Sequence, residues 1–107
     1  MFRAARFVVD SALHHRRWSR EQDIAYMRET LGEPETSAIR EVERYCVQPG
    51  QALSYMLGWR IFSKARAGAE VRLGACFDLR TFHDTVLLNG DMPLDVLARV
   101  IDARAAA

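Results

Sequence analysis

The sequence has few of the residues that build disulfide scaffolds. Among its 107 residues there are two cysteines, Cys46 and Cys76, and three prolines. Two cysteines without a C-x-x-C spacing do not make a disulfide framework or a redox motif. Because Cys46 stands among apolar residues, we expect it to be a buried, reduced thiol.

Metal-site and nucleophile motifs are also missing. A zinc peptidase places two histidines four residues apart, usually as H-E-x-x-H, so that both reach the metal. The sequence has three histidines, but His14 and His15 are adjacent and project about 100° apart on a helix. No third ligand at a suitable spacing accompanies them, so we expect no metal site in this chain. A G-x-S-x-G elbow and a glycine-rich phosphate loop are absent as well.

Long apolar runs and an excess charge are the other absences. No apolar run reaches about 18 residues, so the sequence predicts no transmembrane helix. We do not expect the first residues to form a signal peptide, because Asp10 interrupts their apolar stretch. With 15 basic and 14 acidic residues, neither nucleic acid nor a membrane is an expected partner. We expect a cytoplasmic location for the chain as given, which an upstream signal or lipoprotein segment in a longer precursor would change.

The composition is that of one globular domain, residues 1–107. Half of the residues are hydrophobic and 27% are charged, which is enough apolar surface for a core. The charge alternates in blocks: positive in 1–20, negative in 21–48, positive in 49–77 and negative in 78–107. Such blocks fit helices that pack basic against acidic faces, and they fit equally well solvated surfaces that happen to cluster.

The apolar periodicity predicts an all-α fold of about six helices and no strand. Ser19 and Gln22 form a capping box at the start of the second helix, and Gly32 ends it. A long helix at about residues 51–73 is apolar on nearly every side of its first half, so we expect the other helices to pack around it. The expected core stripes on four other helices are residues 2/5/9, 24/27/31, 39/42/46 and 94/97/101.

One group of polar residues follows the first predicted helix. Arg6, Asp10 and His14 are spaced by four, so they share one side of that helix. Asp10 can pair with Arg6 or accept a hydrogen bond from His14 and thereby fix the histidine tautomer. The alternative is a surface charge ladder that ends in a helix-capping histidine.

A second group opens the long helix, directly after Pro49-Gly50. Gln51 and Tyr55 are one turn apart and are expected to share a face beside Gly58. A buried amide and phenol need hydrogen-bond partners, because leaving them unpaired costs several kcal/mol. The pair is either a core network that fixes the helix register or the polar wall of a substrate cleft, and the spacing alone leaves both open.

Three stretches together carry a family resemblance, namely RAARFVVDSALHHRRWSREQDIAYM, ERYCVQPGQALSYMLGWRI and FDLRTFHDTVLLNGDMPLDVL. In that order they resemble the C-terminal end of the bacterial domain-of-unknown-function 885 family, from about Arg3 to Val100. Members of that family are usually several times longer. They look like helical zinc metallopeptidases with an H-E-x-x-P-G-H-type motif and a further glutamate ligand upstream, and this sequence contains neither.

The resemblance implies roles for six residues. Tyr55 would stabilise the oxyanion that develops on a substrate carbonyl. Gln51 would bond the substrate backbone or orient Tyr55, and His14, held by Asp10, would be a second donor. Two arginines are candidates for binding a terminal carboxylate, Arg6 and Arg80.

The resemblance therefore implies a substrate-side, C-terminal subdomain that lacks the zinc-binding half of a peptidase. We expect no cofactor and no hydrolysis by this chain alone, and a peptide-like substrate only together with the missing half. A cleft face without its cover also favours homo-oligomers through the long helix, where apolar residues would be exposed at Leu53, Met56, Leu57 and Trp59. The alternative is a small helical interaction or dimerisation module in which Gln51 and Tyr55 are structural.

Overall fold

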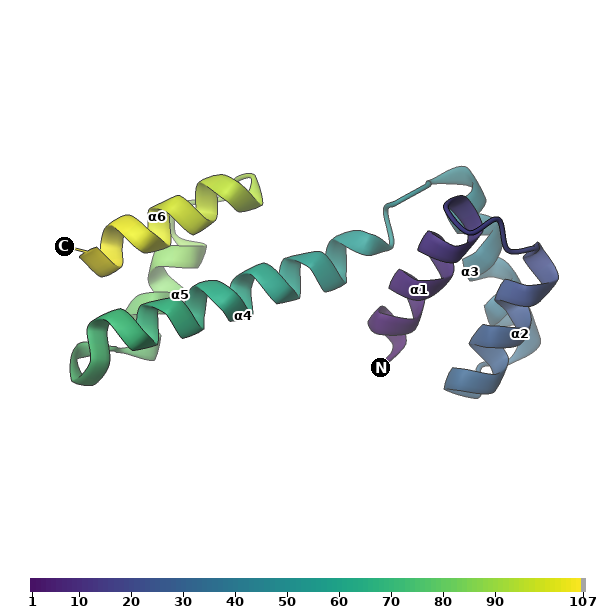
Figure 1. The fold of residues 1–107 in the computed structure, drawn as a ribbon, viewed down its shortest axis with the longest axis horizontal. Coiled ribbons are helices and arrows are strands. Elements are labelled where there is room, and N and C mark those ends of the chain that lie inside the picture. Colours follow the sequence, from purple (N-terminus) through teal and green to yellow (C-terminus); the bar gives the residue numbers. More distant parts are fainter. Residues whose placement is uncertain (107) are drawn as a thin grey trace. The chain divides into compact units, whose positions relative to one another are not determined.

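The computed structural model describes residues 1–106, and in this range it contains six α-helices, one short 3-10 helix and no strand (Figure 1). This confirms the predicted all-α class and helix number. The chain divides into two compact units at Leu57/Gly58, and each is described here by itself. The elements are α1 (Phe2–His14), α2 (Arg20–Leu31), α3 (Glu35–Val47), α4 (Leu53–Leu73), η1 (Gly74–Cys76), α5 (Leu79–Leu87) and α6 (Leu94–Ala106).

The first unit has its core between α1, α2 and α3, which contact one another. Val9, Met27 and Val42, one from each helix, are all fully buried. They come from three of the predicted apolar stripes, and each helix buries that stripe because its opposite face is charged. Ala5 and Ile24 extend the same core.

Local signals set the ends of α2 as the sequence predicts. The Ser19 side chain accepts a hydrogen bond from the Gln22 amide, and the Gln22 side chain accepts one from the Ser19 amide. Gly32 ends the helix in a left-handed conformation with φ of 67°, which a glycine adopts without strain. Both capping interactions satisfy backbone groups that the helix itself leaves free.

The prediction that Cys46 is buried is wrong, because both cysteines are exposed. The buried residues of α3 are Ala38, Val42 and Tyr45, which are four and three residues apart. The buried stripe of α3 is therefore 38/42/45 and not the predicted 39/42/46: its first and last residues each come one position earlier. Tyr45 fills the place expected for the thiol because a phenol is large enough to reach across to α1, where it finds polar partners.

The second unit has a smaller core. Its buried residues come from α4, α5 and α6, and α5 contacts α6 directly. Asp78 caps α5 by accepting hydrogen bonds from the amide and hydroxyl of Thr81. These hydrogen bonds lower the pKa of Asp78, so the cap is ionised at neutral pH. The buried residues of this core are Ala69, Phe82, Leu97 and Ile101.

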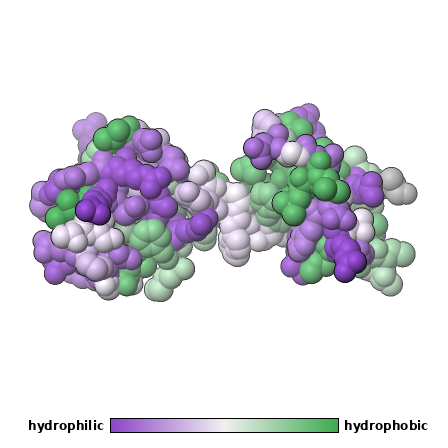
Figure 2. All heavy atoms as spheres, turned by 180° about the vertical axis from the view of Figure 1, so that it is seen from behind, coloured by the Kyte–Doolittle hydropathy of each residue, from purple (hydrophilic) through white to green (hydrophobic). Residues whose placement is uncertain are grey.

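The long helix α4 is far more exposed than the sequence suggests. It begins at Leu53 rather than at Gln51, and of its 21 residues only Ala69 is buried. Leu57, Trp59 and Phe62 in its first half are 41%, 62% and 37% exposed. Figure 2 shows hydrophobic side chains (green) among hydrophilic ones (purple) at the surface of the molecule.

Candidate functional site

The start of α4 is held by a carboxylate on α1. Asp10 is only 1% exposed, and its two oxygens accept hydrogen bonds from the backbone amides of Gly50 and Ala52, at 3.1 and 3.3 Å. Gly50 has φ of 79°, a conformation that side chains disfavour, so the Pro49-Gly50 turn needs its glycine. A charged acceptor for two amides makes a strong anchor, because such bonds are about twice as strong as neutral ones.

His14 lies beside this anchor. Its Nε2 is 2.9 Å from the Tyr45 carbonyl oxygen and 3.4 Å from Oδ1 of Asp10. Because both of these oxygens are acceptors, the hydrogen-bond network assigns the proton to Nε2. Nδ1 makes no hydrogen bond within residues 1–106. The ring borders an open pocket of about 570 Å³ that is lined by Asp10, Ser11, His14, His15, Pro49, Gly50 and Leu53.

Arg6, one turn before Asp10, is buried and already paired. Its Nε donates to the Tyr45 hydroxyl at 3.1 Å and lies 3.2 Å from a Glu41 carboxylate oxygen. The Tyr45 hydroxyl in turn donates to Glu41 at 2.9 Å. Burial and the Glu41 carboxylate raise the pKa of Tyr45 above its usual range, so this phenol stays a neutral donor. Arg6 therefore has its partners inside the unit.

Tyr55 has a different environment from Tyr45. It is half-buried, and its ring faces two guanidinium groups, with the central carbon of Arg3 at 4.2 Å and that of Arg6 at 5.1 Å from the ring centroid. These are cation–π contacts, which hold the ring in place. Within residues 1–106 its hydroxyl makes no hydrogen bond, whereas the Tyr45 hydroxyl makes two. The fixed ring therefore carries a phenol that is free to bind a ligand.

The structure does not bring all the predicted residues together. Gln51 lies in the turn before α4, and its side-chain oxygen accepts a hydrogen bond from Arg44 of α3 at 3.3 Å. Tyr55 contacts arginines of α1 instead, so Gln51 and Tyr55 have different partners. Arg80 is exposed on α5, in the other unit. The residues in contact are the pairs Asp10/His14 and Arg6/Tyr55.

Sequence reasoning missed three residues of this region: Arg3, Tyr45 and Asp23. Asp23 on α2 is completely buried, and neither carboxylate oxygen has a hydrogen-bond partner within residues 1–106. Desolvation raises its pKa to about 6; the His14 charge acts in the opposite direction and the Asp10 charge adds to the rise. Its spacing of four from Met27, on the apolar stripe, was the signal that would have revealed it.

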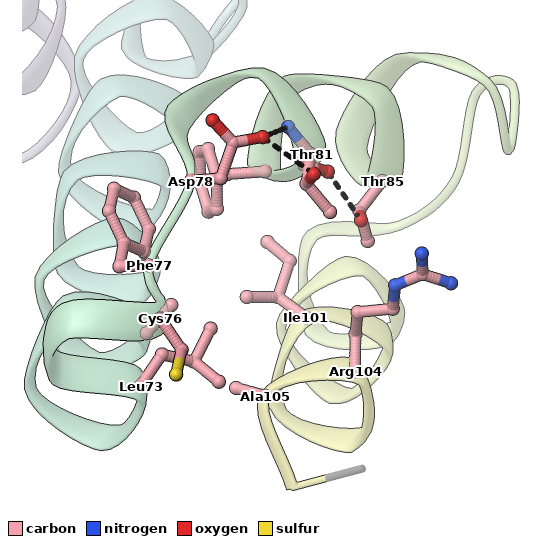
Figure 3. A pocket seen from close by; sticks show the side chains of 11 residues that line it. Leu73, Cys76, Phe77, Asp78, Thr81, Thr85, Ile101, Arg104 and Ala105 are labelled. Carbon is pink, nitrogen blue, oxygen red and sulfur yellow. Dashed lines mark hydrogen bonds between the residues drawn. The ribbon is translucent and has the colours of Figure 1, made fainter.

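The second unit contains a separate cavity of about 80 Å³ (Figure 3). Apolar side chains such as Leu73, Phe77 and Ile101 border it. Its polar neighbours Asp78 and Thr81 bond to each other, as the dashed lines in Figure 3 mark. Because these polar groups already have partners, the cavity reads as a packing defect in a small core rather than as a reaction site.

No group of three His, Cys, Asp or Glu side chains within residues 1–106 is arranged to hold a metal ion. In the same range, none of the helices combines the length and the hydropathy that crossing a bilayer requires.

The chain is similar to known proteins over nearly its whole length. The chain belongs to the family of bacterial proteins of unknown function DUF885, whose model matches residues 1–101. It is similar, at 50% identity and a TM-score of 0.96, to a Colwellia psychrerythraea protein whose crystal structure is described as that of a "putative lipoprotein". That match covers 98% of this chain but only 18% of the longer one. No curated protein matches the chain.

Proposed function

We propose that this chain is the substrate-side subdomain of a longer, peptidase-like protein of its family, in which the Tyr55 hydroxyl donates a hydrogen bond to a substrate carbonyl oxygen. Family membership supports this proposal, as does the share of the longer relative that the chain spans, 18%. The resemblance to zinc metallopeptidases supplies the reaction class, peptide hydrolysis.

The observation that carries the proposal is the contrast between two tyrosines of the same unit. Tyr45 is 1% exposed and has a fully used hydroxyl, as expected of a structural phenol. Tyr55 is half-buried, has its ring fixed by two cations, and has an unused hydroxyl. A donor that is fixed before the substrate arrives stabilises a developing oxyanion without reorganisation, which is how such groups accelerate acyl transfer.

Asp10 and His14 have supporting roles in this proposal. Asp10 holds the turn from which α4 starts, and so it fixes the position of Tyr55 three residues into that helix. Neutral His14 uses its Nε2 proton on the Tyr45 carbonyl, so its Nδ1 accepts. Only as an imidazolium would His14 be the second donor that the resemblance implies.

Zinc would have to be held elsewhere in the longer protein. The resemblance implies zinc for full-length relatives, where it supplies an activated water, but the side chains of residues 1–106 do not form a site for it. No step through the metal follows from this chain, and we expect the chain alone not to hydrolyse peptides. The cytoplasmic location expected from the sequence likewise stays a prediction.

A chimera tests the proposal. This chain would replace the matching segment of the longer relative, and hydrolysis of a peptide panel would be measured with zinc present. We expect Tyr55→Phe to lower kcat about 10²–10³-fold with little change in KM, as removal of one oxyanion donor does. Tyr45→Phe is the matched control: it should lower stability by about 1–2 kcal/mol and leave kcat of the folded enzyme nearly unchanged.

Two outcomes contradict the proposal. One is a folded parent and chimera that both fail to cleave every peptide of the panel. The other is an active chimera in which Tyr55→Phe keeps full kcat.

The interaction module remains a second candidate because of one observation. Leu57, Trp59 and Phe62 are exposed on α4, and large exposed apolar side chains are typical of association surfaces. In that function the chain binds another protein surface through α4, and Tyr55→Phe is expected to have no effect on any activity.

A further inference from the structure

Arg3 is the free cation beside Tyr55. Its side chain is exposed, and within residues 1–106 it has no carboxylate within ion-pair distance. Its guanidinium carbon lies 4.2 Å from the centroid of the Tyr55 ring, the shortest cation–π distance in the described chain. Arg3 is therefore ordered by a ring rather than neutralised by an anion.

The contact with the ring leaves the hydrogen-bonding capacity of Arg3 unused. A guanidinium has five N–H donors in one plane, and they match the two oxygens of a carboxylate. A ring that holds the cation in place also lowers the entropy lost when those donors bind an anion. Arg3 and Tyr55 together offer a cation and a neutral donor side by side.

The surroundings of Tyr55 keep an excess of positive charge. Arg6 is the second cation at the ring, and its Nε lies 3.2 Å from Oε2 of Glu41. The other oxygen of Glu41, Oε1, lies 3.8 Å from Nη1 of Arg44. The Glu41 carboxylate is thus shared by two guanidinium groups, and Arg3 adds a third guanidinium group beside Tyr55. Nη2 of Arg6 is buried without a hydrogen-bond partner, so Arg6 is a positioning residue that a ligand does not reach.

From this geometry we propose that Arg3 binds a carboxylate group of the peptide whose carbonyl oxygen meets Tyr55. The inference rests on the proposed function and names its substrate class, peptides that carry a carboxylate near the bond to be cleaved. It also gives to Arg3 the carboxylate-binding role that the resemblance implies for Arg6 and Arg80. The carboxylate belongs either to the peptide C-terminus or to an acidic side chain, and the test separates these sources.

The test uses the full chain and three small ligands. Nitrogen-15-labelled protein is titrated with acetyl-Ala-Ala as the free acid, with its C-terminal amide, and with acetyl-Ala-Glu amide. We expect the free acid to shift the side-chain resonance of Arg3 and the backbone resonance of Tyr55, while the uncharged amide does not. A response to acetyl-Ala-Glu amide as strong as that to the acid assigns the site to acidic side chains as well.

Matched variants make the test specific. Arg3→Gln should weaken binding of the free acid about tenfold, the usual loss for a charge-assisted hydrogen bond, and it should keep the spectrum of the folded protein. Arg40→Gln removes another exposed arginine of the same unit that has no ion pair among residues 1–106, and it should leave the affinity unchanged.

Equal binding of acid and amide, equal loss in both variants, or no shift with any ligand would overturn the inference. These outcomes are distinct from failure of the proposed function, which the chimera reports. Binding by Arg3 with an inactive chimera leaves a carboxylate site without peptidase activity. An active chimera with no binding by Arg3 leaves the peptidase proposal without this specificity.

Discussion

Asp23 is the residue whose chemistry conflicts most with its position. It is fully buried, neither of its oxygens has a hydrogen-bond partner within residues 1–106, and the charged groups acting on it are Asp10 and His14 of α1. A buried carboxylate is costly when it is ionised, so the folded state favours the protonated form. The protein should therefore bind a proton at Asp23 that the unfolded chain releases.

This predicts a pH dependence of stability. The pKa of Asp23 is about 6 in the folded protein and roughly 3.9 in an unfolded chain, so between these values the folded state holds the extra proton. The contribution of Asp23 to the free energy of unfolding is complete below about pH 4 and is lost as pH rises through about 6. The loss amounts to about 2–3 kcal/mol, and Asp23→Asn should remove it.

The measurement is urea unfolding from pH 4 to pH 7, followed by Trp18 fluorescence in a Trp59→Phe background, so that the signal comes from the first unit. Other ionisable groups are the same in both proteins. The difference between wild type and Asp23→Asn therefore isolates the effect of Asp23. A difference that does not change with pH would show that Asp23 is ionised with partners in solution.

Residue-level prediction succeeded where the deciding partner is close in sequence. Ser19 and Gln22 cap α2 and Gly32 ends it, because each bond spans three or four residues. Cys46 was placed wrongly, because the choice between it and its neighbour depends on which side of α3 meets α1. That choice depends on a polar partner of Tyr45, Arg6, which lies 39 residues earlier in the chain.

At the scale of elements, the contact between α1 and the start of α4 is the main long-range feature. The turn at 50–52 is fixed by Asp10, which lies 40 and 42 residues earlier in the chain. The local pattern does not reveal this contact: the apolar pattern extends to Gln51, whereas α4 begins at Leu53 and the amides of Gly50 and Ala52 donate to a carboxylate far away in the sequence. The local sequence pattern also could not predict that Tyr55 contacts arginines of α1, because these residues are far apart in the sequence.

The anchor gives a prediction for Asp10→Ala. Two buried backbone amides would lose a charged acceptor, so we expect a destabilisation of about 3 kcal/mol and faster hydrogen exchange at Gly50 and Ala52. The matched control is Asp95→Ala, which removes an exposed ion pair with Arg99 and should change stability by less than about 1 kcal/mol. Unchanged exchange at the two amides in Asp10→Ala would contradict the anchoring role.

At the scale of the whole molecule, the sequence predicted the class, the helix number and much of the core. Helical periodicity reports which residues prefer burial, and the stripes of α1, α2 and α6 are occupied by Val9, Met27 and Ile101. It does not report whether a partner is present to bury them. The exposed apolar residues of α4 are the clearest example, since the same pattern that predicted a covered helix is found on a solvated one.

We therefore predict that the isolated chain forms homo-oligomers through α4. Trp59 is 62% exposed, and burying such a ring is among the most favourable contacts that an interface offers, commonly more than about 2 kcal/mol. Sedimentation velocity at tens of micromolar should show a species larger than the monomer. Trp59→Glu should weaken association at least about 30-fold, because the charge must lose its water to enter the interface.

Leu88→Glu tests whether a charge at any exposed apolar residue would weaken association. Leu88 is 81% exposed at the end of α5, outside α4, so its replacement should leave the association constant unchanged. A chain that sediments as a clean monomer contradicts the prediction, and so does a loss of association that is equal in both variants. If α4 alone controls assembly, its apolar face is a binding surface, and the longer relatives would be expected to cover that face with residues beyond the segment matched here.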